Sequence, residues 1–441
     1  AAEAARAAES SPNTVLISAV AIEGKGRVKN ALEASNLMLE LFQNSGLKNA
    51  LDVFDISKIV KGLSKEHRKE LTAAKDDRLA EVMLKKLDGL NKKSVFIEFV
   101  REGAGGKPSS DALLSAIWMT LGWDALIRRG ISKVTIAALP WYSRIFSTMV
   151  GCSSPAAKHA NDAFCGVKND ELIGKWSFTE AAFLALIGRR PDEKELFEFS
   201  MLLGLIISNG PGTISAQGSK GGVSSDGPED PSRVQINKAF IGFMSHTGFA
   251  HGGNGYEAIA FLIERFKDAK LKNPSDKKHG IDLTAIADNY SKWYNKYKAE
   301  QKSFGNIEYL KIPCVNHPVF KGKAVNYDPR ERFVSALFEE KGIYNVFLDF
   351  YGKLVNSLFE NKVSKEVYCV NVDAVIAVIL LKIVWEAFSK GKMHDKEVES
   401  AAFTTFLFGR MIGCAAEIDD HINRGKNMDT RTAASKCMFV G

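Results

Sequence analysis

The sequence predicts a mainly helical protein preceded by an α/β domain, and three observations lead to this fold class. The chain has 441 residues, enough for two or three domains of about 150 residues each. Its first part alternates apolar, β-rich runs with amphipathic stretches, which is typical of an open α/β sheet. From about Trp141 onward the pattern is helical. We therefore expect residues 1–150 to form an N-terminal α/β domain of unassigned role.

The elements follow from local patterns in chain order. Four runs are expected to be strands: TVLISAVAI from Thr14, LDVFDI from Leu51, SVFIEFV from Ser94 and KVTIAAL from Lys133. Ser177 with Glu180 forms a capping box that opens one helix, and Pro191-Asp192 opens the next. The Gly/Ser/Asp/Pro-rich stretch 218–232 is expected to be a loop. Further helices are predicted at 254–269, 283–300, 328–340, 344–361, 373–389 and 396–422.

Composition narrows the class of protein. Lys plus Arg outnumber Asp plus Glu by 59 to 52, a mild excess that suits a small anionic ligand and is not the basic stripe of a duplex-binding protein. We expect no nucleic-acid partner. Six cysteines without a CxxC pair indicate reduced thiols.

Membrane and targeting segments are not expected either. The most apolar stretch, 374–381, is closed by Lys382 and Glu386, far short of the ~20 residues that span a bilayer. The N-terminal AAEAARAAES lacks the apolar run of a secretory signal and an initiating Met. A cytoplasmic protein is expected, with the mitochondrial matrix as the alternative.

Three residues are candidates for catalysis because of their type and their surroundings in the sequence. His251 and His317 lie in segments with glycine or proline, and Asp373 stands between apolar residues. Burial raises the pKa of a carboxyl group, and a carboxylate made basic in this way can take a proton from a weak carbon acid. Each also has a structural alternative: a loop histidine, a turn histidine and a helix N-cap.

Two other segments invite a functional interpretation. The acidic EIDDH, 417–421, could suggest a metal, but on a helix its side chains fan outward, so we expect a charged surface and no metal site. SKWYNKY, 291–297, mixes aromatic and basic residues as a nucleic-acid patch would. The surface of an amphipathic helix explains it more simply.

The segments around the three residues resemble motifs of the citrate synthase and citryl-CoA lyase superfamily. The helix pair ELIGKWSFTEAAFLALIGRRPDEKE precedes five such segments, in the family's order between Gly151 and Gly441. NGPGTISAQ resembles DHGPxxS, GFAHGGNGYEAIAFL resembles GxxHGGAN, and NHPVF with the later NYDPRERF resembles GHRVY with DPR. VNVDAV resembles NVD, and FGRMIG resembles SRxxG.

The resemblance implies a reaction and the roles of three residues. Asp373 would be the base that takes a proton from the methyl or methylene of an acyl-CoA thioester. His251 would donate a hydrogen bond to the developing enol oxygen, and His317 would polarise the ketone of a 2-oxo acid. The same residues would cleave a citryl-CoA-like thioester in reverse, so synthase and citryl-CoA lyase both stay open.

Substrate-binding residues are also implied. Arg330 and Arg410 match family arginines that hold carboxylates, and Arg431 is preferred over Arg424 as the third. Lys321 and Lys323, on the turn after His317, are the candidates for the phosphates of CoA, the expected co-substrate.

The family fold implies a large helical domain, residues 151–254 with 369–441, a small helical domain, residues 255–368, and a homodimer or higher oligomer. One substrate residue departs from the pattern. Asn209 takes the place of the histidine in DHGP, and an amide supplies no positive charge. Either the acceptor is less charged or differently shaped than oxaloacetate, or the protein is a non-catalytic CoA-binding or assembly subunit.

Overall fold

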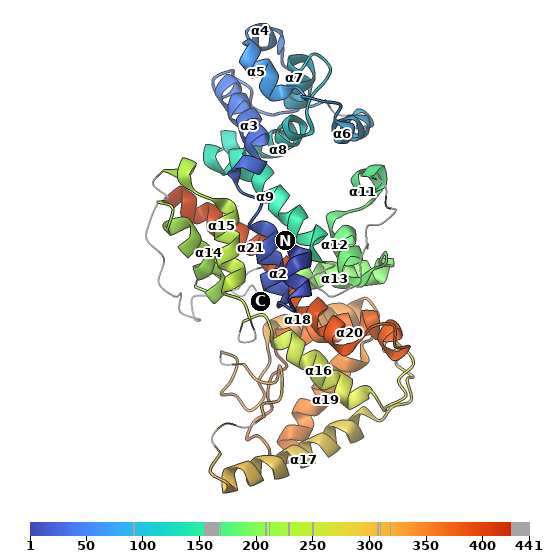
Figure 1. Ribbon diagram of the computed structural model, residues 1–441. Coiled ribbons are helices and arrows are strands. Elements are labelled where there is room, and N and C mark those ends of the chain that lie inside the picture. The colour runs from blue at the N-terminus through green and yellow to red at the C-terminus, as the bar shows by residue number, and fades with distance from the viewer. Residues whose placement is uncertain are drawn as a thin grey trace.

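The structure, a computed structural model, describes residues 1–441 except 91–92, 154–166, 168, 208–209, 211, 228–229, 249–250, 307, 309, 318 and 425–441. Across these described residues the chain is helical, with isolated β-bridges and no sheet (Figure 1). The α-helices are α1 (Ala2–Ala7), α2 (Pro12–Val20), α3 (Lys29–Phe42), α4 (Ser57–Lys61), α5 (Lys65–Leu71), α6 (Arg78–Asp88), α7 (Val95–Gly103), α8 (Ser110–Ile127), α9 (Lys133–Gly151), α11 (Asn169–Lys175), α12 (Phe178–Ile187), α13 (Glu193–Ile206), α14 (Ile214–Ser224), α15 (Ile236–Ser245), α16 (Asn254–Phe266), α17 (Leu283–Ser303), α18 (Pro329–Glu340), α19 (Val346–Glu360), α20 (Val372–Ser389) and α21 (Asp395–Arg424).

The predicted α/β character of residues 1–150 is wrong. Of the four expected strands, three lie in α2, α7 and α9, and the LDVFDI run has no regular structure. Ser94, the first residue of one of these runs, and Ser132, which directly precedes another, are helix N-caps whose hydroxyls accept from backbone N–H groups three residues on. A short apolar run without strict alternation fits a buried helix as well as a strand, and here the serine caps favour the helix.

The apolar side chains form two cores that meet along α9. The smaller core lies between residues 34 and 136, where Phe42 packs edge-on against Phe96 and Phe99. Trp123 is fully buried there and its indole N–H donates to the Leu47 carbonyl (3.0 Å). Figure 1 shows these helices at one end of the molecule, with α9 leading into the rest.

The larger core includes α2 and the second half of α9 together with the helices from α12 to α21. α20 is buried on nearly all sides, which explains why its sequence is apolar without a polar face. Asn13 on α2 donates to the carbonyls of Met244 (3.1 Å) and Thr247 (3.2 Å), so the N-terminal segment is fixed to the end of α15. The predicted domain boundaries stay predictions.

One loop prediction is wrong in part, because residues 218–224 belong to α14. Glycines occur here for close packing: a Cβ at Gly218 would lie 2.3 Å from the Gly242 carbonyl oxygen of α15, and one at Gly242 would lie 2.2 Å from that of Gly218. The backbones of α14 and α15 touch at this point, which no larger residue allows.

Most of the other helix predictions are confirmed. Ser177 and Asp192 both form capping boxes, at the starts of α12 and α13. The six later helices begin within two residues of their expected starts. Within the described chain, the helical span Asp395–Asn423 has the length and composition of a membrane span, but 78% of its most apolar window is buried in the fold.

Candidate active site

Asp373 lies in the first turn of α20, where several segments meet. Asn371 caps this helix, because its side-chain oxygen accepts from the Asp373 N–H (3.2 Å). The alternative interpretation of Asp373 as the N-cap is therefore wrong. The first turn of α16 is in contact here, since a Cβ at Gly255 would lie 3.6 Å from the Asp373 carbonyl oxygen. The carboxylate thus lies at the positive end of the helix dipole, beside the helix that follows His251.

His317 is held next to the start of α20 by backbone bonds. The Asn316 N–H donates to the Cys369 carbonyl (2.8 Å), and the Asn371 N–H donates to the Cys314 carbonyl (2.9 Å). Nδ1 of His317 accepts from the Val319 N–H (3.1 Å), so the neutral ring carries its proton on Nε2. The ring stacks on Phe320 at 4.7 Å. The segment therefore presents His317 as an N–H donor.

Burial and three charged groups, Asp373 among them, act on the pKa of His317. Burial, followed by the charge of Arg330, lowers the pKa of His317, while Asp328 and Asp373 act in the opposite direction. A histidine with a lowered pKa is neutral near pH 7. His317 is thus a neutral donor within the electrostatic reach of the candidate base.

His251 lies in the turn that precedes α16. Its Nε2 is 2.9 Å from the hydroxyl of Ser215 on α14, and its ring meets Phe406 of α21 edge-on at 5.7 Å. Gly252 has φ 98°, and a Cβ there would lie 2.5 Å from the Phe406 ring, so only glycine permits this turn. Burial and then the charge of Arg410 lower the pKa of His251 to about 4. The ring is therefore neutral at ordinary pH.

Arg330 is locked beside His317 by a bidentate ion pair. Its Nε and Nη2 donate to the two oxygens of Asp328, at 3.0 and 2.7 Å, and Asp328 is fully buried. Asp328 Oδ2 also accepts from the Val372 N–H (3.2 Å). One carboxylate thereby caps α18, orients Arg330 and ties both to the first residue of α20.

Arg410 approaches the same centre from α21. Its side chain is 3% exposed, its Nε donates to the Ile206 carbonyl (3.0 Å), and its guanidinium lies over the Phe406 ring at 5.1 Å. Burial lowers the pKa of Arg410, and the charge of Asp373 opposes that effect. His251 and Arg410 thus contact the same aromatic ring. The structure accordingly brings together five of the residues that the sequence singled out: His251, His317, Arg330, Asp373 and Arg410.

The remaining candidates are not brought into this cluster. Lys321 and Lys323 are exposed on the loop between His317 and α18, and the Lys323 amine lies 6.0 Å from the Tyr327 ring. Asn209 and Arg431 lie outside the described residues. The CoA-phosphate and third-arginine predictions therefore stay predictions.

Sequence reasoning missed the residues that position the others. Ser215 lies within the NGPGTISAQ segment, and Asp328 is the first residue of DPR, so both stood inside motifs already noted. Phe320 likewise ends the NHPVF segment, whereas Phe406 lies outside the motifs and had no signal beyond being aromatic, because one of the residues that it contacts, His251, is distant in the chain.

The arrangement combines one carboxylate, two neutral imidazoles and two guanidinium groups. Such a set can take a proton from carbon, donate hydrogen bonds to two oxygens on which charge develops, and hold carboxylates by bidentate pairing. Within the described part of the chain, no cluster of three or more His, Cys, Asp or Glu side chains could hold a metal ion.

Comparison with known proteins returns neither a matching family model nor a matching curated protein. Among solved structures, the chain is similar to the citryl-CoA lyase of Hydrogenobacter thermophilus: 20% identity, a TM-score of 0.41, and coverage of 62% of this chain and 86% of that one. It is also similar to the ATP citrate lyase of Methanothrix soehngenii in complex with citrate and coenzyme A, at 16% identity and a TM-score of 0.39, over 62% of this chain and 38% of that chain.

A third solved structure is a citrate synthase of Thermoplasma acidophilum, in ternary complex with carboxymethyl coenzyme A and oxaloacetate. It shares 14% identity at a TM-score of 0.40, over 93% of this chain and 85% of that one. These three solved structures are thus a citryl-CoA lyase, an ATP citrate lyase and a citrate synthase.

Proposed function

We propose that this protein forms or cleaves the carbon–carbon bond between an acyl-CoA, with acetyl-CoA as the first candidate, and a 2-oxo acid. The observation that carries the proposal is that the segments of His251 and His317 both contact the start of α20, which carries Asp373: the helix after His251 does so through Gly255, and the segment before His317 through the bond from the Asn371 N–H to the Cys314 carbonyl. A structural role alone requires no such convergence.

Each residue has a chemical role in the proposed reaction. The Asp373 carboxylate takes a proton from the carbon next to the thioester. The neutral His251 ring donates a hydrogen bond to the enol oxygen, which it can do without being a strong acid. Nε2–H of His317 donates a hydrogen bond to the ketone of the acceptor, because Nδ1 already accepts one from the Val319 N–H.

Arg330 and Arg410 hold the carboxylates of the 2-oxo acid. Arg330 is oriented by Asp328 and Arg410 by the Ile206 carbonyl, so both are positioned before substrate binds. CoA is a co-substrate, and its phosphates meet Lys321 and Lys323. Closure of the small domain over the large one excludes water, and a homodimer supplies the third arginine.

The direction of the reaction follows from conditions and not from the site, because a catalyst accelerates both directions. Citryl-CoA lyase activity is the second candidate, favoured by the Gly-Pro that follows Asn209. A non-catalytic CoA-binding or assembly subunit is the third. It is favoured by Asn209 itself, which cannot supply the charge of a histidine.

The deciding experiment follows deuterium exchange and thiol release. The protein is incubated with acetyl-CoA in heavy water, with and without a panel of 2-oxo acids, and separately with citryl-CoA. We expect deuteration of the methyl group, thiol release with at least one acceptor, and cleavage of citryl-CoA. The complete absence of all three would refute the enzyme and leave the non-catalytic subunit.

Two variants sharpen this experiment. Asp373→Asn should abolish exchange, because an amide is not a base, and Asp395→Asn is the matched control since Asp395 is an exposed acid in the first turn of α21. Full activity in Asp373→Asn would contradict the assigned base. Asn209→His is expected to gain use of oxaloacetate.

A further inference from the structure

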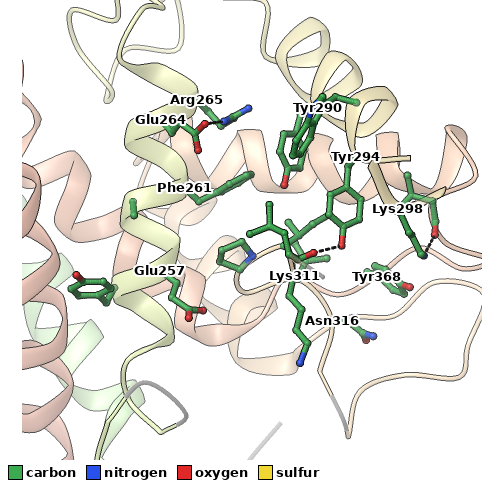
Figure 2. Close-up of a pocket in the computed structure, with 18 of the residues that line it drawn as sticks. Glu257, Phe261, Glu264, Arg265, Tyr290, Tyr294, Lys298, Lys311, Asn316 and Tyr368 are labelled. Atoms are coloured by element: carbon green, nitrogen blue, oxygen red, sulfur yellow. Dashed lines mark hydrogen bonds and ion pairs between the residues drawn. The ribbon is translucent and has the colours of Figure 1, made fainter. Parts of the chain in front are cut away.

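Figure 2 shows a cavity of about 1320 Å³ between α16, α17 and residues 308–316. It includes Asn316, the neighbour of His317, so it adjoins the candidate active site already described. A second cavity, of about 880 Å³, shares no lining residue with it and includes none of the five residues that the candidate active site brings together. Its volume is within the ~300–1,000 Å³ of ordinary small-molecule sites. This second cavity, named the α20-end cavity below, is therefore a separate place for a ligand.

The α20-end cavity lies at the C-terminal end of α20. The last two turns of α20 line it, together with the start of α13 and with segment 271–274, which follows α16. The Trp385 indole N–H donates to the Leu271 carbonyl (2.9 Å), so this segment is fixed to α20. The first turns of α16 and α20 meet at the other end of the two helices, beside Asp373. A ligand in this cavity thus binds at the far ends of the helices that build the candidate active site.

One cation of this cavity is buried. The Lys382 side chain is 9% exposed, and its amine donates to Glu198 of α13, whose side chain is 2% exposed. A buried ammonium group requires such a partner. An ammonium has three donors, and within the described chain Lys382 uses one of them, so two are left for a ligand. A negative charge that enters the cavity therefore meets a cation that solvent screens little.

Two further cations of the lining serve the fold. Arg189 pairs with both carboxylate oxygens of Glu195, and this glutamate also completes the capping box at the start of α13. Lys390 pairs with Glu386 at the C-terminal end of α20, where the helix dipole favours a positive charge. Each of these pairs is neutral, so neither adds to the net charge that a ligand meets.

Two lysines of the lining have no such role. Lys272 and Lys392 are exposed, and within the part of the chain that the structure describes neither amine forms an ion pair or a hydrogen bond. The backbone of Lys392 is fixed, because Gly391 has φ 69° and the Lys392 N–H donates to the Ala387 carbonyl (2.8 Å). The two lysines come from different segments that share the cavity. Together they give it a surplus of two positive charges.

This surplus defines the head group of the ligand. A phosphate monoester carries about two negative charges above its second pKa, which is about 6. Ammonium groups bind phosphate as point charges, whereas the planar fork that favours a carboxylate is used here by Arg189 for Glu195. The rest of the lining is mostly apolar and consists chiefly of Ile187, Leu271, Pro274, Ile383, Val384, Ala387 and Met393. A fitting ligand therefore joins a phosphate monoester to an apolar body.

We propose that the α20-end cavity binds a small phosphate monoester. Its phosphate meets Lys272, Lys382 and Lys392, and its body packs against the apolar side chains of the lining. The ligand thereby joins segment 271–274 to the turn that follows α20. No residue of this site takes part in the proposed reaction, so the two proposals stand or fall separately.

Calorimetry with the full chain, without acyl-CoA or a 2-oxo acid, tests the proposal. Phenyl phosphate is the probe, and phenyl sulfate is the matched control, because it has a similar shape and one negative charge fewer. At about pH 7.5 we expect phenyl phosphate to bind, and phenyl sulfate and inorganic phosphate to bind at least about tenfold more weakly. No binding of phenyl phosphate at millimolar concentration, or equal binding of either control, would overturn the proposal.

Variants locate the site. Lys272→Ala and Lys392→Ala are each expected to weaken the binding of phenyl phosphate about tenfold, the equivalent of one hydrogen bond to a charged group. Lys277→Ala is the matched control, since Lys277 is an exposed lysine of the same loop outside the cavity, and it should change nothing. Unchanged affinity in both cavity variants would overturn the site.

The buried cation needs a paired substitution. Lys382→Met alone would leave Glu198 buried without its partner and would destabilise the fold. Lys382→Met combined with Glu198→Met removes both charges, and we expect this variant to bind phenyl phosphate at least about tenfold more weakly. The same affinity as in the unmodified protein would overturn the contact with Lys382.

Two further measurements test the location. Backbone amides of residues 271–276 and 390–393 should exchange hydrogen more slowly when phenyl phosphate is bound, while those of α3, in the smaller core, should not change. Protection that spares both segments would overturn the assigned cavity. CoA, which also carries a phosphate monoester, should not displace phenyl phosphate. One-for-one displacement would assign the cavity to the co-substrate and overturn a separate site.

Discussion

The pKa of His251 gives the most direct test of the candidate active site. Burial is the larger cause of its lowering to about 4, and the charge of Arg410 is the smaller. The test lowers the pH and compares the protein with the His251→Gln variant, which lacks the titrating group. In the unfolded chain the same histidine has a pKa near 6.5.

The sign and size follow from proton linkage. As pH falls from 7 to 4, the unfolded state binds a proton at His251 and the folded state does not, so the free energy of unfolding decreases. A difference of about 2.5 pKa units at about 1.36 kcal/mol each corresponds to about 3 kcal/mol. The loss relative to His251→Gln is therefore expected between pH 6.5 and 4. It should level off below pH 4, where the folded state also takes up the proton.

Two measurements check this expectation. Urea unfolding of both proteins at a series of pH values gives the difference, in which the other titrating groups cancel. The ring signal of His251, assigned with the variant, gives the pKa directly. In Arg410→Gln this pKa should rise but stay below 6.5, because burial is the larger cause. A signal that titrates at 6.5 in the unmodified protein, or a pH-independent difference, would refute the argument.

Three further substitutions test the supports of the site and the fold. Asp328→Asn removes the carboxylate of a buried ion pair, so we expect a loss of about 3 kcal/mol in stability and a raised KM for the 2-oxo acid, measured by thermal unfolding and steady-state kinetics. Gly252→Ala combines a positive φ with a clash against Phe406, so it should lower the free energy of unfolding by at least about 3 kcal/mol. Gly391→Ala, with φ 69° and open space around it, should lower it by about 1 kcal/mol. Equal losses in the two variants would contradict the clash. Ser132→Ala should lower stability by about 1 kcal/mol as the loss of a helix cap, whereas no change would contradict its role at the start of α9.

The helices after Trp141 could be predicted because their signals are local. Ser177 and Asp192 carry their capping partners three residues away, so the sequence itself contains the hydrogen bonds that begin α12 and α13. Two of the apolar runs before residue 150 have serine caps, Ser94 and Ser132, but neither has the Glu or Gln three residues on that completes a capping box. Their helical state depends on burial against helices distant in the chain, such as α2 against α15, which no local window contains.

The residues of the candidate site also fall into two groups, those with a local sequence signal and those whose role depends on distant contacts. His251, His317 and Asp373 could be found because each lies within a short motif. Ser215 and Asp328 lie within motifs too, but their importance comes from contacts with residues that are 36 and 44 positions away. The glycines of α14 predict a loop, because only the packed structure shows that Gly218 is there to admit α15.

The charges of the site connect substrate binding to the acid of the proposed reaction. Without substrate, burial and Arg330 lower the pKa of His317, and burial and Arg410 lower that of His251, so both rings begin neutral. A 2-oxo acid whose carboxylates pair with the two arginines offsets their positive charge, and this raises the pKa of the neighbouring histidines. While the acceptor is bound, the raised pKa makes His317 hold more firmly the proton that it exchanges with the ketone oxygen. In the proposed reaction the arginines therefore act on the chemistry as well as on binding, because their charge adds to the lowering of the histidine pKa values that burial causes.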